Sequence, residues 1–390
     1  MSTEITTEKK EVSQSYWSLV WWKFRRNRLA LIGGVIVIIF YVVCALGAEF
    51  FSPYLLERQS DFLSVQPQRL QFFNEDGSFA GRPYVYGLEE KIDMVKRLRT
   101  YEPNLEQKIP LHFFVKGEPY KLMGLIPWDV HLYGAAPCSD NNPTALECSP
   151  EYSHITEETQ IFIFGSDRLG RDMLSRIIYG GRLSLLIGLI GQFMTLFLGS
   201  ILGAASGYYG GAVDMAVMRT TEFLSAFPDI PLFMALAAAI PPTWNPIWIY
   251  FMLTIILAFV RWGGLARQVR GLVLSLRERE YVLAAQSFGA SDGRIMFRHL
   301  IPGAFSHIIV ISTLAIPGMI LAETALSFLG LGLRPPLTSW GVLLQEASTV
   351  RVIRFSPWFL LPVPFVVTVV LGFNMLGDGL RDALDPYGGQ

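Results

Sequence analysis

The chain has 390 residues, of which 51% are hydrophobic and 17% are charged, and its mean hydropathy is positive. This composition is too apolar for an ordinary soluble protein of such a length, so we predict a membrane protein. The formal net charge of −1 gives no indication of a polyanionic partner such as a nucleic acid.

The amino-terminal region joins a polar tail to the first apolar run. Residues 1–14 are polar and without apolar periodicity, and they are predicted to form a disordered cytoplasmic tail. Residues 15–50 hold a basic, Trp-rich interfacial segment followed by the first span, at 29–50. This run is longer than the core of a signal peptide and has no clear cleavage site after it, so we expect it to remain as an anchor.

Residues 51–165 are too long for a simple connection and predict a small inserted α+β domain. Strands are expected at 69–73 and 84–86, and the composition of 89–99 is typical of a helix. A hairpin of 111–115 and 120–122 is expected to turn at Lys116-Gly117-Glu118.

Two cysteines, Cys138 and Cys148, lie in this domain. Because Asn141-Asn142-Pro143 between them favours a chain reversal, they form a candidate disulfide in an oxidising compartment. The alternative is that one or both are unpaired, and the sequence leaves both open. No histidine or further cysteine stands beside them, so the spacing gives no support for a metal site.

Residues 166–182 alternate apolar and basic side chains at helical spacing and are predicted to form an interfacial helix that lies flat. The bilayer core of about 30 Å needs about 20 apolar residues per helix. Besides the first span, five runs qualify, at 183–206, 220–240, 246–265, 304–329 and 357–376. The fold predicted is therefore a polytopic α-helical protein with six spans, a transmembrane core at 183–376 and a cytoplasmic tail at 377–390.

Basic side chains cluster just before the first span and just after the fourth. Because loops rich in Lys and Arg stay on the cytoplasmic side, both termini are predicted to be cytoplasmic and 51–166 to lie outside. The arginines of 166–182 oppose this orientation unless that segment lies in the interface.

Two carboxylates fall within predicted spans, where a charge is costly. Glu323 is surrounded by apolar and small residues, and Asp229 stands between Pro228 and Pro231. Either residue could line a translocation path. For Glu323 we favour hydrogen bonding within the bundle, and for Asp229 a local helix break that lines a cavity.

Residues 277–302 form a charged, helix-forming segment between the fourth and fifth spans. A helix at 277–288 would be about 18 Å long. Gly289 would then allow a sharp turn or the close approach of a partner. Pro302 is expected to end the segment, because its ring cannot continue a helix from upstream. An ordinary amphipathic loop is the alternative.

This segment resembles the cytoplasmic coupling segment of ABC-importer permeases, in which Glu-Ala-Ala is followed by three residues, Gly, and a closing Leu-Pro. The positions that fill or flank the frame are Glu278, Glu280, Leu283, Ala284, Ala285, Gly289, Ala290, Ile301 and Pro302. The chain also resembles the second of the two paired permeases in the oligopeptide/dipeptide (peptide/nickel) branch. The similar stretches are residues 164–185, 321–332 and 377–386. Leu283 replaces the first Glu of the pattern, so Glu278 or Glu280 is the candidate substitute.

The resemblance implies a non-catalytic translocation subunit in the cytoplasmic (inner) membrane of a prokaryote. It implies four kinds of partner besides membrane lipid: a second permease, two ABC ATPases and an extracytoplasmic solute-binding protein. The sequence contains no Gly-x-x-x-x-Gly-Lys-Ser/Thr loop, so this chain is expected to bind no cofactor and to leave ATP and Mg to the ATPases.

Short peptides are the cargo that the resemblance favours, with oligosaccharides and metal chelates as alternatives. Two other classes of protein remain open. One is an ion-coupled secondary transporter that uses Glu323 and Asp229 as proton or sodium sites. The other is a sensor or assembly factor that moves no solute.

Overall fold

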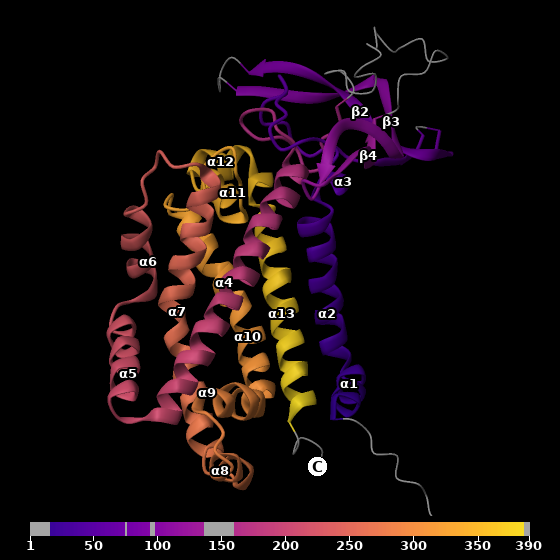
Figure 1. Ribbon diagram of the computed structural model, residues 1–390. Coiled ribbons are helices and arrows are strands. Elements are labelled where there is room, and N and C mark those ends of the chain that lie inside the picture. Colours follow the sequence, from indigo (N-terminus) through magenta and orange to yellow (C-terminus); the bar gives the residue numbers. More distant parts are fainter. Residues whose placement is uncertain (1–15, 75, 94–97, 136–159, 386–390) are drawn as a thin grey trace, which may run out of the picture.

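The computed structural model describes residues 16–74, 76–93, 98–135 and 160–385. A bundle of long helices carries an antiparallel sheet at one end and two short helices, α8 and α9, at the other (Figure 1). Five helical segments of the described chain are long and apolar enough to cross a membrane, and a bent helix pair makes a sixth if it counts as one span. The predicted helical membrane fold is confirmed.

The first span runs from Arg28 to Leu46 and follows a short helix that lies across its base. Asn27 begins it, because its side chain accepts a hydrogen bond from the Ala30 amide at 3.2 Å. Gly33 allows the first span to pack closely on the last helix of the chain, because a Cβ at this position would lie 2.6 Å from the Gly372 carbonyl oxygen. The elements are α1 (Tyr16–Arg26), α2 (Arg28–Phe40), the π-helix η1 (Tyr41–Leu46) and α3 (Ala48–Phe51).

The sheet is antiparallel in the order β1-β2-β3-β4. Its strands are β1 (Gln71–Phe73), β2 (Phe79–Asp93), β3 (Leu98–Leu122) and β4 (Ile126–Ala135). β3 is long enough to pair with β2 over its first half and with β4 over its second. A buried cluster that includes Val85, Ile109 and Tyr133 forms the core of the sheet, and Leu174 of the helix bundle packs against it.

Two predictions for this domain were wrong. Residues 89–93 and 98–99 belong to the β2–β3 hairpin, in which pairing of 89–93 with 98–102 across the strands outweighs local helical propensity. The β3–β4 turn lies at Gly124, whose φ of +74° suits glycine, rather than at residues 116–118. Gly117 stays within β3, where it leaves room for the His131 ring. Cys138 and Cys148 lie outside the described residues.

The prediction of a separate, flat interfacial helix at 166–182 was also wrong. A single helix, α4 (Met173–Tyr209), begins at Met173 and runs for 37 residues. Protein carboxylates pair with three of the four arginines that suggested an interface, and the fourth, Arg168, donates to Thr349 Oγ1 at 3.1 Å. Arg176 is 2% exposed and contacts Asp167 and Glu346, and Arg182 donates to both oxygens of Glu49 at 2.6 and 2.5 Å.

The predicted third span is broken. α5 (Gly211–Ser225) and α6 (Asp229–Ala238) meet at an angle of 91°, and Pro228 precedes the first residue of α6. The break follows from proline, which removes a backbone donor and restricts the residue before it. The fourth span, α7 (Pro246–Leu276), continues 11 residues beyond the predicted end at 265.

The remaining helices complete the bundle. They are α8 (Glu280–Ser287), α9 (Asp292–Ile295), the π-helix η3 (Met296–Leu300), α10 (Ile301–Phe328), α11 (Trp340–Ala347), α12 (Val350–Phe355), the 3-10 helix η4 (Pro357–Leu360) and α13 (Pro362–Leu384). Because α13 extends to Leu384, most of the predicted tail at 377–390 is helical, and its last five residues lie outside the described ranges.

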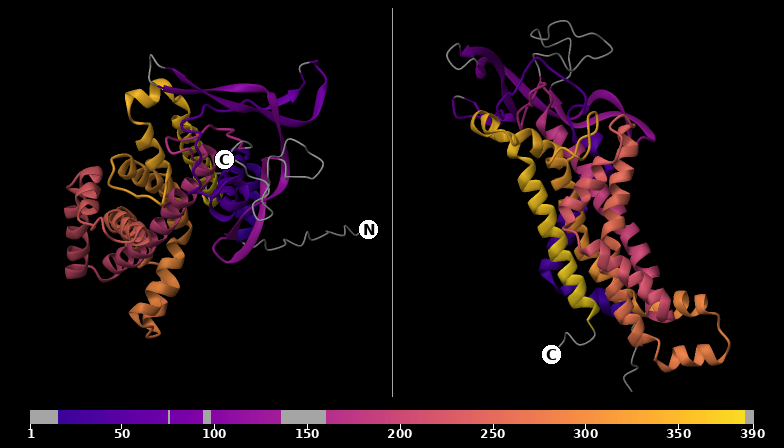
Figure 2. Two further views of the ribbon diagram at one scale, coloured as in Figure 1. Left: turned by 90° about the horizontal axis from the view of Figure 1, so that it is seen from above. Right: turned by 90° about the vertical axis from the view of Figure 1, so that its left-hand side faces the viewer.

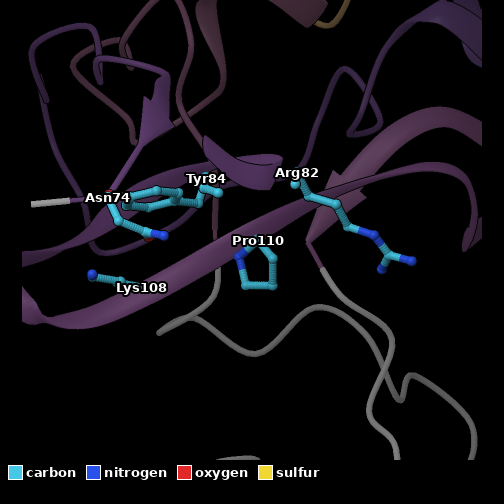
Figure 3. A pocket seen from close by; sticks show the side chains of 7 residues that line it. Asn74, Arg82, Tyr84, Lys108 and Pro110 are labelled. Atoms are coloured by element: carbon cyan, nitrogen blue, oxygen red, sulfur yellow. The ribbon is translucent and has the colours of Figure 1, made fainter. Parts of the chain in front are cut away.

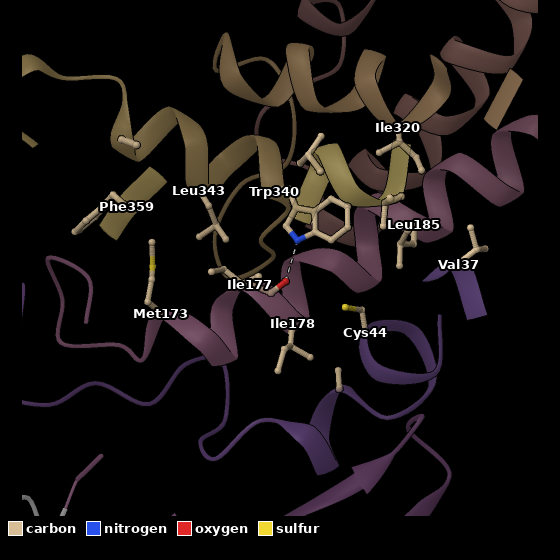
Figure 4. Packing of buried hydrophobic residues seen from close by; sticks show 14 of the residues in the cluster. Val37, Cys44, Met173, Ile177, Ile178, Leu185, Ile320, Trp340, Leu343 and Phe359 are labelled. Carbon is tan, nitrogen blue, oxygen red and sulfur yellow. Dashed lines mark hydrogen bonds between the residues drawn. The ribbon is translucent and has the colours of Figure 1, made fainter. Parts of the chain in front are cut away.

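The largest core joins the first span, α4, α11 and α13 around Trp340, which is fully buried (Figure 4). Its indole Nε1 donates to the Ile177 carbonyl oxygen at 3.0 Å, so the polar atom of the ring is satisfied within apolar surroundings. This core lies directly below the sheet and keeps that end of the bundle together.

Candidate functional site

The segment between α7 and α10 projects from the bundle at the end opposite the sheet (Figures 1 and 2). α7 ends at Leu276, so the turn at 277–279 shortens the predicted helix of 277–288 to α8, which has 8 residues. At 1.5 Å per residue, α8 is about 12 Å long.

Gly289 ends α8 by its backbone conformation. Its φ is +75°, its amide donates to the Gln286 carbonyl at 2.9 Å, and the Ala290 amide donates to the Ala285 carbonyl at 3.1 Å. These two bonds form a Schellman motif, which requires a left-handed residue at the position of Gly289. No atom lies within 4 Å of a Cβ built there, so the glycine serves the turn.

The segment is fixed to the bundle on one side. Val282 and Ile295 are buried in a cluster with residues of α4, α7 and α10, and Ala290 and Ile301 pack against that cluster. The Tyr208 hydroxyl of α4 donates to Asp292 at 2.9 Å. These contacts join the segment to three long helices.

The opposite side of the segment is open. Phe288 is 92% exposed, and Leu283, at the position where the family pattern has Glu, is 49% exposed. Glu278, Glu280 and Ala284 are exposed as well. This side of the segment therefore exposes two carboxylates at the start of α8 and a large apolar ring at its end.

Pro302 does not end the segment as predicted. α9, η3 and α10 follow one another without a non-helical residue. The π-helix lies just before Pro302, and its wider hydrogen-bond spacing accommodates the proline ring and the missing amide hydrogen.

A polar cavity of about 300 Å³ lies among the helices near the break between α5 and α6. Asp229 faces Arg261 of α7 across 3.6 Å. The lining includes Gln192 and Thr195 of α4, each 4% exposed, and Thr195 Oγ1 has no hydrogen-bond partner among the described residues. Sequence reasoning identified Asp229 but missed the other three, although an arginine within a predicted apolar span was the available signal.

Glu323 does not line this cavity. Its side chain is 1% exposed and accepts hydrogen bonds from Ser184 at 2.9 Å and Ser327 at 2.7 Å. The favoured interpretation, hydrogen bonding within the bundle, agrees with these contacts. The two predicted intramembrane carboxylates therefore have different surroundings.

A second cavity, of about 490 Å³, lies on the sheet between β2 and β3. Figure 3 shows the side chains of Arg82 and Lys108 pointing in different directions on either side of Pro110. Lys108 lies 5.4 Å from the centre of the Tyr84 ring, and Arg82 contacts the His112 ring. Because these cations do not converge, we assign no ligand to this surface.

The long apolar helices define an integral membrane protein, and the segment between α7 and α10 projects from it. Two family profiles match the chain. One, described as a binding-protein-dependent transport system inner membrane component, matches residues 196–387, and the other, the N-terminal transmembrane domain of oligopeptide transport permease C, matches residues 15–67. The sheet falls in the interval between the two matched ranges.

Bacterial relatives are similar over much of their length. The oligopeptide transport system permease protein OppC of Haemophilus influenzae is 43% identical over 224 residues, which are 57% of this chain and 70% of the relative. The dipeptide transport system permease protein DppC of Alkalihalophilus pseudofirmus is 42% identical over 57% of this chain and 71% of its own length. The chain therefore belongs to the inner-membrane permease family of binding-protein-dependent transport systems, as its sequence motifs predicted.

Proposed function

We propose that this chain is the permease subunit of an ATP-driven, binding-protein-dependent importer for oligopeptides or dipeptides. Family membership supports the transport role, and the names of the relatives support the cargo. The observation that carries the mechanism is the exposed α8, held at its base by three long helices and ending in Phe288.

In this mechanism two ATPase subunits hydrolyse ATP, and one of them grips α8. Closure of the ATPases draws α8 along, and α4, α7 and α10 follow through the cluster around Val282. A second permease completes the path, and a solute-binding protein delivers the cargo at the sheet end. α1 and the end of α13 lie at the same end as α8 (Figure 1), which supports cytoplasmic termini.

The cavity at Asp229 is proposed as part of the path. A peptide in its usual ionic form carries an ammonium and a carboxylate, and the single 3.6 Å contact between Asp229 and Arg261 offers one partner to each. Polar groups such as Thr195 Oγ1 are free to bind the backbone of a passing peptide.

The test is reconstitution of the complete transporter in vesicles. Phe288→Asp and Gly289→Trp are expected to lower both ATPase co-purification and ATP-dependent peptide uptake several-fold, while the chain still inserts. Asp229→Asn should lower uptake and leave ATPase recovery unchanged. Val350→Asp, an equally drastic change at an 81% exposed residue at the other end, is the control for ATPase recovery.

The alternatives give other results. Uptake that needs no ATP but is abolished by ionophores would identify an ion-coupled transporter. Full ATPase recovery with both α8 variants would exclude this docking surface. Competition by oligosaccharides or metal chelates, but not by peptides, would reassign the cargo.

A further inference from the structure

The hairpin formed by β3 and β4 carries apolar side chains that the sheet core does not use. Leu125, at its tip, is 80% exposed, and its neighbours on the tip are more than half exposed. These are Met123, Ile126 and Trp128. Exposed apolar side chains are usually scattered singly over a protein surface, so several of them at one tip indicate a contact surface.

This hairpin is fixed to the end of the first span. The buried His131 ring lies 2.7 Å from the Ser52 carbonyl oxygen and 3.1 Å from the Glu118 carbonyl oxygen. Glu118 also pairs with Arg58. Contacts on both strands therefore hold the hairpin to the chain that leaves the membrane after α3.

The ring of Phe114 relates the second half of β3 to the end of the first span. It lies 6.2 Å from the ring of Phe50 in α3. The first span, Arg28–Leu46, has 19 residues and extends at most about 28 Å at 1.5 Å per residue, and Phe50 follows it in α3. Because the hydrocarbon core is about 30 Å thick, Phe50 and Phe114 fall at its boundary with the headgroups.

The apolar surface continues from the span onto the hairpin. Ile38, Val42 and Leu46 are exposed along the first span, and Phe114 is 68% exposed just beyond. Phe114 has a φ of +56°, in the left-handed region that residues other than glycine rarely adopt. Figure 1 shows β4 beside α3 at the end of α2. In the left view of Figure 2, strands of the sheet extend beyond the outline of the helix bundle.

We propose that the tip of the β3–β4 hairpin, residues 123–128, rests in the headgroup layer of the membrane. Trp128 suits this layer because its ring is apolar and its N–H can bond to headgroups. The Lys121 ammonium, exposed on the same hairpin, can reach lipid phosphates. The lipid contact would hold the sheet at a constant height above the entrance to the bundle.

Site-directed spin labelling tests the proposal in the full-length chain. Leu125→Cys is labelled in a background with Cys44, Cys138 and Cys148 replaced, and the protein is placed in nanodiscs of phosphatidylethanolamine and phosphatidylglycerol. Oxygen partitions into the bilayer and a nickel chelate stays in water, so the ratio of oxygen to nickel accessibility reports depth. Leu105→Cys is the matched control, since Leu105 is 59% exposed in the first half of β3, away from the tip.

The ratio at position 125 is expected to be several-fold higher than at position 105, with or without the other transporter subunits. Equal ratios overturn the proposal. Protection at position 125 that needs another subunit overturns it too and identifies a protein contact instead. If the cysteine-free background does not fold, quenching by headgroup-brominated lipid is compared between the native chain and Trp128→Phe, and quenching that the substitution leaves unchanged overturns the proposal.

Discussion

At the scale of single residues, the carboxylate of Glu323 is stable inside the bundle because hydrogen-bond donors meet both of its oxygens. Ser184 of α4 donates to one oxygen and Ser327 of α10 to the other. Ser184 Oγ also accepts from the Trp340 amide at the start of α11, at 3.2 Å. The Ser184 hydroxyl thereby links α4 to both α10 and α11, and Glu323 takes part in this packing network.

Substitution of Glu323 separates hydrogen bonding from charge. Glu323→Gln keeps an acceptor and is expected to unfold near the native temperature in detergent. Glu323→Ala leaves the Ser184 and Ser327 hydroxyls without a carboxylate partner and should lower the unfolding free energy by about 1–3 kcal/mol. Thermal unfolding of the three proteins measures the difference. If both variants unfold alike but transport is lost, Glu323 acts in the path instead.

At the scale of elements, α4 and α7 pack closely because glycines recur on one face of α4. A Cβ at Gly199, Gly203 or Gly207 would lie within 3.0 Å of atoms of α7. At Gly203 it would lie 2.5 Å from the Ala266 carbonyl oxygen, which belongs to the backbone and cannot rotate away. Small residues at a spacing of four are the usual means by which membrane helices approach each other.

Gly203→Leu is therefore expected to push the two helices apart and to destabilise the protein by about 1–3 kcal/mol. Thermal unfolding in detergent measures the loss, and Gly203→Ala should show a smaller one. The matched control is Gly271→Ala in α7, where no atom lies within 4 Å of a Cβ. That change should be neutral or raise stability by up to about 1 kcal/mol through helix propensity. Equal effects at Gly203 and Gly271 would contradict close packing.

At the scale of the whole molecule, the sheet and the bundle meet at the start of α4. Leu174 packs against the sheet core, and Arg176 joins the turn before α4 to Glu346 of α11. Asp172 caps α4 by accepting from the Ser175 amide at 2.7 Å, and its other oxygen has no hydrogen-bond partner among the described residues. Burial raises the pKa of the Asp172 carboxyl from its ordinary value of 3.8 to about 7.

This junction should respond to pH. Between about pH 4 and about pH 7 the folded chain keeps a proton on Asp172 that the unfolded chain releases, so the unfolding free energy falls as the pH rises. Asp172→Asn keeps a capping acceptor and cannot ionise. The unfolding temperature of the variant relative to the native chain should therefore be higher at about pH 8 than at about pH 5. A difference that is the same at both values would show that Asp172 stays ionised.

Much of the architecture was determined by the sequence itself, since crossing a bilayer requires long apolar helices and the glycine of the α8 turn needs a left-handed conformation. The spans and the coupling segment follow from such local requirements. Only the tertiary structure decided the conformation of residues 89–93 and 166–182, because partners elsewhere in the chain outweighed local patterns. Residues 89–91 pair with Thr100–Glu102 in the sheet. Glu346 binds Arg176 and Glu49 binds Arg182 inside the protein.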